Sequence, residues 1–208
     1  MSEWKRLRNE WLPAGFAPVV MGGAKEASLA LEVFDLNSES VAQLLELAGA
    51  HSAARVFKER EQSLGVGFDS LEKGNWPSQV APQAFSVQCE ILSGKPHAKV
   101  FIAKLPTTKS HEIPVLLKCG GWNDCPLAQE HSAVMKYWHE KYGAEIFSVT
   151  GEIIECSVAR PPATREEATK LAYEQFLYCP DIVTQGTESL LALAATLVNS
   201  KVWYFWWD

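Results

Sequence analysis

The segment from Cys119 to His131 holds the residue types of this sequence that are best suited to chemistry. A thiol, an acid, an amide and an imidazole fall within it, and two glycines and a proline interrupt the chain between them. A cysteine at a helix N-terminus can be a nucleophile, because its thiol pKa is lowered there, and a nearby histidine can serve as a general base. The alternative is that these side chains are buried and structural, since free cysteine is among the most buried residue types.

We expect a candidate pocket that combines four residues of this segment with an aspartate from later in the chain. Its residues are Trp122, Asn123, Cys125, His131 and Asp181. Cys125 and His131 are six positions apart, nearly two helical turns, so simple contact along one helix face is not expected. The alternative to the pocket is a structural role for each residue. In that case Asn123 would cap a helix, and Asp181 would tie a turn or pair with Arg160.

The five cysteines are an odd number with no close pairing pattern, which predicts free thiols in a reducing compartment. Cys119, Cys125, His131 and His139 could ligate zinc, but their spacings match none of the usual structural zinc patterns. We therefore predict neither metal nor cofactor, with a zinc-dependent scaffold as the alternative. No phosphate loop, dinucleotide fingerprint or paired-carboxylate site is recognisable.

The charge of the chain is unevenly distributed. The net charge of −6 arises in residues 111–208, which carry 7 basic and 13 acidic residues, whereas residues 1–110 carry 12 of each. An acidic surface argues against direct nucleic-acid binding and favours a basic protein partner, although a solubilising surface would look the same. No apolar run reaches the roughly 20 residues of a membrane span, and the charged N-terminus is unlike a signal peptide, so we expect a cytoplasmic protein.

Strands and helices alternate in the second half of the sequence. Gly143 ends a helix, Thr164 and Glu167 form a capping box, and Thr187 caps the last helix. The predicted elements are a strand over 113–118, a helix over about 125–142, strands over 144–150 and 152–159, helices over about 164–179 and 190–198, and a strand over 202–206.

The last of these strands is rich in aromatic residues, and three of the eight tryptophans lie in the final six positions. In an extended chain Trp203 and Phe205 project to one face, and Tyr204 and Trp206 to the other. We expect this strand to be covered core rather than a ligand platform.

The first half of the sequence is less regular. A helix is predicted over 41–48, capped by Asn37 or Ser38, and it resumes over 53–62. The remaining predictions are an amphipathic or loosely docked lead-in over 1–15, an apolar run over 16–21, a strand over 28–34, a loop over 63–82, and strands over 85–92 and 99–105 that form a hairpin.

These elements predict an α+β fold, in which helices pack on the faces of a mainly antiparallel, mixed sheet. The polar stretch 107–110 is the expected boundary. It divides an N-terminal α/β region (1–106) from a C-terminal domain (107–208) with the order β-α-β-β-α-α-β.

Several short motifs follow one another along the second half of the sequence. They include Gly-Gly-Trp-Asn-Asp-Cys-Pro at 120–126, Tyr-Gly-Ala-Glu at 142–145, Arg-Pro-Pro at 160–162, Tyr-Cys-Pro-Asp-Ile at 178–182, Gln-Gly at 185–186 and Trp-Tyr-Phe-Trp-Trp-Asp at 203–208. In register and in order, these motifs resemble the bacterial domain-of-unknown-function family numbered 4253. The resemblance covers about the last hundred residues and leaves residues 1–106 outside it.

The resemblance implies a small cytoplasmic bacterial domain of the kind found beside secreted polymorphic toxins. It therefore suggests an immunity protein: a non-enzymatic binding protein that blocks a cognate toxin, such as a nuclease effector of a contact-dependent or type VI secretion system. The expected toxin contacts are exposed acids: Glu130, Glu140, Glu166, Glu167 and Glu188. The competing hypothesis is an enzyme or small-molecule-binding protein that uses the pocket centred on Cys125 and His131.

Overall fold

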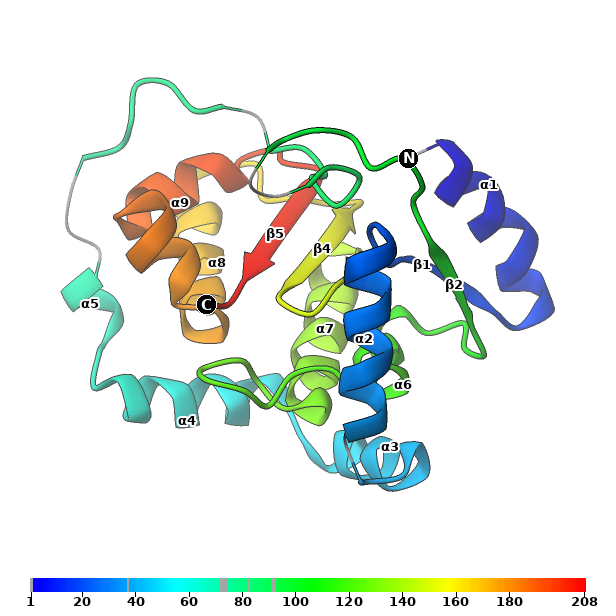
Figure 1. The fold of residues 1–208 in the computed structure, drawn as a ribbon. Helices are drawn as coiled ribbons and strands as arrows, with labels where there is room; N and C mark the ends of the chain where they lie inside the picture. The colour runs from blue at the N-terminus through cyan, green and yellow to red at the C-terminus, as the bar shows by residue number, and fades with distance from the viewer. Residues whose placement is uncertain (1, 37, 72–74, 82, 91–92) are drawn as a thin grey trace.

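The computed structural model describes residues 2–36, 38–71, 75–81, 83–90 and 93–208 (Figure 1). The helices are α1 (Ser2–Trp11), α2 (Ala24–Leu36), α3 (Val41–Ala50), α4 (Ala53–Leu64), α5 (Phe68–Leu71), α6 (Ile113–Leu116), α7 (Ala128–Tyr142), α8 (Arg165–Tyr178) and α9 (Leu190–Leu197). The turns η1 (Leu12–Ala14) and η2 (Ser110–Glu112) are 3₁₀-helical, and η3 (Ile182–Thr187) is π-helical. The strands are β1 (Ala17–Val20), β2 (Ile102–Leu105), β3 (Ala144–Val149), β4 (Ile153–Val158) and β5 (Val202–Trp206).

In the described part of the chain, five strands form one sheet with the order β2-β1-β3-β4-β5. β1 is parallel to β3, and the other neighbouring strands are antiparallel. The predicted α+β class, with a mainly antiparallel mixed sheet, is confirmed. The boundary after residue 106 stays a prediction, and the sheet extends across it, because β1 and β2 precede that residue.

The two faces of the sheet are covered differently. On one face Cys156 and Phe205 belong to the main core, together with residues of α7, α8 and α9. On the other face Phe147 packs with Trp4 of α1 and with Val87 in a much smaller cluster. Figure 1 shows α7 behind β4, and α8 and α9 beside β5. None of the helices in the described residues is long and apolar enough to cross a membrane.

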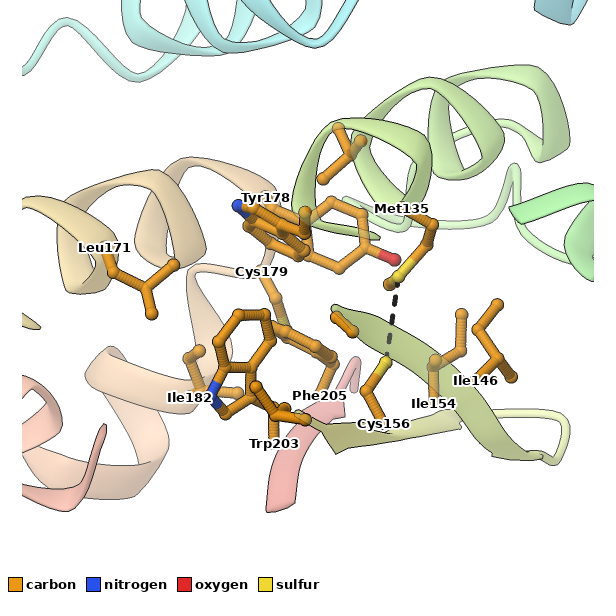
Figure 2. Close-up of a cluster of buried hydrophobic side chains, with 14 of the residues drawn as sticks. Met135, Ile146, Ile154, Cys156, Leu171, Tyr178, Cys179, Ile182, Trp203 and Phe205 are labelled. Atoms are coloured by element: carbon orange, nitrogen blue, oxygen red, sulfur yellow. Dashed lines mark hydrogen bonds between the residues drawn. The ribbon is translucent and has the colours of Figure 1, made fainter. Parts of the chain in front are cut away.

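Aromatic rings from three elements form the centre of the main core. Trp203 and Phe205 of β5 are fully buried, so one face of this strand is covered core as predicted, whereas Tyr204 and Trp206 on the other face are half-buried. Phe205 stacks on Trp138 of α7 with ring centroids 5.4 Å apart. Tyr178 of α8 meets Phe205 edge to face at 5.0 Å. Figure 2 shows Tyr178, Trp203 and Phe205 converging with aliphatic and sulfur-containing side chains from the helices and the sheet.

The prediction of a strand over 113–118 is wrong, because this segment contains the helix α6. Pro114 occupies the first turn, where its missing N–H is no loss. Ile113 and Val115 are buried within the helical segment. A short, uninterrupted apolar run cannot be assigned to strand or helix from its periodicity alone.

Two further strand predictions in the first half are also wrong. Residues 28–34 lie inside α2, since Ala30 and the leucines on either side of it are strong helix formers. Of the predicted hairpin over 85–105, the described residues form one antiparallel bridge, between Cys89 and Pro96, and the strand β2, whose partner is β1. The described residues before it form a loop, tied to the sheet where the backbone N–H and the hydroxyl of Ser86 donate to the buried carboxylate of Glu155. Residues 91 and 92 of the predicted hairpin lie outside the described residues.

The predicted helix ends are largely confirmed. Gly143 ends α7 in a left-handed conformation, and Thr164 opens α8 with a capping box. Two caps are assigned to the wrong residue. Ser40 caps α3 instead of Ser38, while Asn37 lies outside the described residues. Ser189 caps α9 instead of Thr187, because the π-helical turn η3 occupies the chain up to that residue.

Truncation of Phe205 tests the aromatic core. Phe205→Ala should lower the free energy of unfolding by about 3–5 kcal/mol, because it leaves a cavity against Trp138. Its neighbour Tyr204 is the matched control, since it lies half-buried on the opposite face, as predicted. Tyr204→Ala should cost clearly less in the same urea titration. Equal losses for the two variants would contradict this assignment of the core.

Candidate functional site

A tight turn brings the thiol of Cys125 to the start of α7. Gly120 and Gly121 have φ angles of 95° and 83°, in the left-handed region that favours glycine. A Cβ atom on Gly120 would lie 2.0 Å from the carbonyl oxygen of Pro126 and 2.7 Å from Nε2 of His131. The glycine therefore lets the backbone pass directly against the imidazole.

Three buried side chains form a hydrogen-bonded chain at this turn. The Cys125 Sγ atom lies 3.4 Å from Nε2 of His131, and Nδ1 of His131 lies 2.5 Å from the hydroxyl oxygen of Tyr178. Either neutral imidazole tautomer satisfies both contacts, with one ring nitrogen donating and the other accepting. As expected, this is not a contact along one helix face: Cys125 precedes α7 and reaches His131 through the turn.

Burial determines the protonation states of this chain. It raises the pKa of the Cys125 thiol, lowers the pKa of His131 to about 3, and raises the pKa of Tyr178. Cys125 also does not belong to the first turn of α7, which begins at Ala128. All three groups are therefore neutral at pH 7, whereas a nucleophilic cysteine needs its thiolate. The structural alternative fits these residues better than the catalytic one.

The other predicted pocket residues lie apart from this buried chain. Asn123 is exposed, and its Nδ2 donates to the backbone carbonyl of Asp208 at 2.7 Å. The backbone N–H of Asp208 donates to Asp181 at 3.1 Å, and Asp181 also accepts from Gln185 at 3.2 Å. Asp181 thus ties a turn, one of its two expected roles. Trp122 is half-buried against the main core.

The structure excludes two of the expected roles, the pairing of Asp181 with Arg160 and the capping of α7 by Asn123. Arg160 donates to the backbone carbonyl of Glu140, at the end of α7, rather than to Asp181. Asn123 does not cap α7, since Leu127 occupies the N-cap position. The residues of the predicted pocket therefore lie in different places: Cys125 and His131 belong to the buried chain, whereas Asn123 and Asp181 bind the backbone of Asp208.

Tyr178 is the residue of the buried chain that the sequence did not indicate. It ends α8, and its hydroxyl group meets a histidine 47 positions earlier in the chain. A tyrosine at a helix end carries no local signal of such a partner.

No three histidine, cysteine, aspartate or glutamate side chains within the described ranges converge as ligands of one metal ion. His139, one of the four residues considered for zinc, instead has its Nδ1 atom 3.0 Å from the carbonyl oxygen of Ala144. The described residues thus supply no evident donor set for the zinc-dependent alternative.

Two of the five glutamates considered as partner contacts stabilise helix starts. The carboxylate of Glu130 is half-buried and accepts from the backbone N–H of Leu127 at 2.8 Å. Glu167 accepts from the backbone N–H of Thr164 at 3.3 Å, within the capping box of α8. Both carboxylates bind orphan N–H groups of a helix, so their replacement would also affect folding.

The other three glutamates lie on the surface. Glu166 is highly exposed and pairs with Lys170 at 2.6 Å, one helical turn away. Glu140 and Glu188 are also exposed. The latter two are therefore the most suitable positions for changing surface charge without removing a cap.

The low pKa of His131 predicts a pH-dependent stability. The unfolded chain takes up a proton near pH 6.5 and the folded protein only near pH 3, so stability falls as the pH decreases between these values. When the pH is lowered from 7.5 to 5.0, this group should reduce the free energy of unfolding by about 2 kcal/mol. We expect His131→Gln to remove that part of the pH dependence in urea titrations. Identical pH dependence in the two proteins would contradict a buried neutral imidazole.

Thiol reactivity provides an independent check on Cys125. Native protein treated with iodoacetamide should be alkylated first at the half-buried Cys89, and much more slowly at Cys125. Peptide mass spectrometry after timed quenching measures both rates in one sample. Unfolding in urea should make the two rates similar. Faster native alkylation of Cys125 than of Cys89 would restore the nucleophile hypothesis.

Comparison with known proteins identifies the family of the second half. No curated protein and no solved structure matches the chain. The family described as "Domain of unknown function (DUF4253)" matches residues 101–208. The match begins before β2 and includes β3, β4 and β5, so it starts somewhat earlier than the resemblance read from the motifs. Because it covers more than half of the chain, the protein belongs to the DUF4253 family.

Proposed function

We propose that this protein is a non-enzymatic binding protein: an immunity protein that binds a cognate bacterial toxin and occludes its active or substrate site. The toxin is expected to be a nuclease effector delivered by a contact-dependent or type VI secretion system. The excess of acidic over basic residues in positions 111–208 is the observation that carries this proposal. A nuclease needs a basic surface to hold its nucleic acid, and an acidic protein complements that surface.

The distribution of charge supports such a partner. The excess of acidic residues lies in residues 111–208, where Glu140, Glu166 and Glu188 are exposed. Complementary fields accelerate the encounter of two proteins and discriminate against partners of the wrong charge. An inhibitor that must capture a toxin rapidly would benefit from this effect.

The competing enzyme hypothesis is less well supported. It requires an accessible thiolate or imidazole, whereas Cys125 is 7% exposed and His131 is 1% exposed. Both groups are neutral at pH 7, and the hydrogen-bonding groups of His131 are used within the protein. A binding surface needs none of these groups to be reactive.

The direct test is to isolate the tagged protein from its native host and identify its partner by mass spectrometry. We expect one stoichiometric partner that carries a basic nuclease domain and is toxic when expressed alone. Co-expression of the present protein should restore growth. A partner without toxicity, or toxicity that co-expression does not relieve, would contradict the proposal.

Charge reversal tests the electrostatic basis of the proposal. Glu140→Lys combined with Glu188→Lys should slow association with the toxin about tenfold at low salt, and the difference should shrink as salt screens the charges. Glu32→Lys combined with Glu46→Lys is the matched control, because it makes the same charge change at exposed positions of the N-terminal region. Stopped-flow association rates compare the two proteins. Equal rates would remove the role assigned to the exposed glutamates of the DUF4253 region.

A further inference from the structure

A cleft of about 830 Å³ lies at the β5 edge of the sheet, on the face opposite the main core. Its wall consists of Ala24, Lys25, Glu26, Glu90, His97, Glu152, Tyr204 and Trp206. These residues come from the start of α2, the loop before β2, the turn before β4 and the strand β5. Neither the Cys125 chain nor the glutamates considered as toxin contacts belong to this cleft.

Two aromatic rings form one wall of the cleft. Tyr204 and Trp206 are alternate residues of β5, so both project from the face opposite Phe205. Both are half-buried, whereas the core-facing residues of the strand are fully buried. Exposed ring faces of tyrosine and tryptophan attract cations through the ring quadrupole, tryptophan most strongly.

The opposite side of the cleft contains a polar group without a hydrogen-bond partner. The Oε2 atom of Glu26 is buried and accepts no hydrogen bond. His97, whose side chain is 10% exposed, places Nε2 3.9 Å from that oxygen, too far for a hydrogen bond. An unsatisfied buried carboxylate oxygen is costly. The Glu26 side chain is 25% exposed, so a rotation of its carboxylate would present that oxygen to a ligand that donates a hydrogen bond.

The backbone is shaped to hold this histidine in place. A Cβ atom on Gly23 would lie 2.5 Å from Nδ1 of His97 and 3.0 Å from Oε2 of Glu26. The absence of a side chain at residue 23 therefore lets both polar groups pack against the start of α2. This arrangement distinguishes the cleft from a chance cluster of surface acids.

The charges around the cleft define its ligand. Three carboxylates, those of Glu26, Glu90 and Glu152, face one ammonium group, that of Lys25. A planar cation with several N–H donors can stack on an indole while it donates to carboxylates, and guanidinium has this geometry. We propose that the cleft binds the side chain of an arginine presented by a protein partner. This inference rests on the proposed function, because a basic toxin is the expected source of that arginine.

The proposal is tested with a blocked tripeptide, acetyl-Gly-Arg-Gly-amide, and its neutral isostere in which citrulline replaces arginine. Nuclear magnetic resonance of protein with 15N-labelled tryptophan follows the indole N–H signal of Trp206. We expect saturable shifts with the arginine peptide and none with the citrulline peptide. Glu152→Gln and Glu26→Gln should each weaken binding about tenfold. Glu46→Gln, a distant exposed position, should leave it unchanged.

Several outcomes would overturn the proposal. Equal shifts with both peptides would show that charge is not recognised, and no shift with either would show that the cleft does not bind arginine. If free arginine binds more than tenfold more tightly than the blocked peptide, the ligand is the free amino acid and not a side chain of a partner.

The closing experiment separates this inference from the proposed function. The captured toxin is titrated against wild-type protein and the variant carrying both Glu26→Gln and Glu152→Gln. Weaker toxin binding by the variant supports the cleft as a contact site. Equal binding overturns the cleft and leaves the immunity role intact. Peptide binding without any captured toxin removes the proposed function, and with it the assigned source of the arginine.

Discussion

The indole of Trp138 lies where α7, α8 and β5 meet, and much of the packing in the DUF4253 region depends on its contacts. Its ring stacks on Phe205 and meets Tyr178 and Trp203 edge to face. Its N–H group donates to Glu174 at 2.9 Å, so the ring is fixed by a polar contact as well as by aromatic ones. Aromatic residues bury large areas and prefer defined relative geometries, which makes this contact both strong and specific.

The buried polar chain depends on the same core. The ring of Tyr178 packs edge to face with Trp138, and its hydroxyl group contacts His131, which in turn contacts Cys125. A buried polar group destabilises a protein unless it is hydrogen-bonded, so these three side chains require one another. Their role is to fix the turn at Gly120 against α7, and a neutral chain achieves this without the desolvation cost of a buried charge.

The sequence predicted those features that depend on neighbouring residues. The capping box at Thr164 and the left-handed cap at Gly143 are local, and the alternation along β5 reflects a strand with two different environments. The run around Val115 was misassigned, because an uninterrupted apolar run lacks the periodicity that separates strand from helix. The site was only partly predictable. His131 and Cys125 were identified as a pair, but their contact depends on backbone angles at Gly120 and on Tyr178, which no local pattern encodes.

The position of β1 in the sheet has a consequence for the order of folding. β3 and β4 are joined by a short turn, and β5 follows β4 after the helices α8 and α9. Val20 of β1, in contrast, must find Ser148 of β3 across more than a hundred residues. Closing a long loop costs entropy before any contact rewards it, and non-local pairing slows folding. The strands β3, β4 and β5 are therefore expected to assemble first, and β1 and β2 are expected to dock last on the edge of β3.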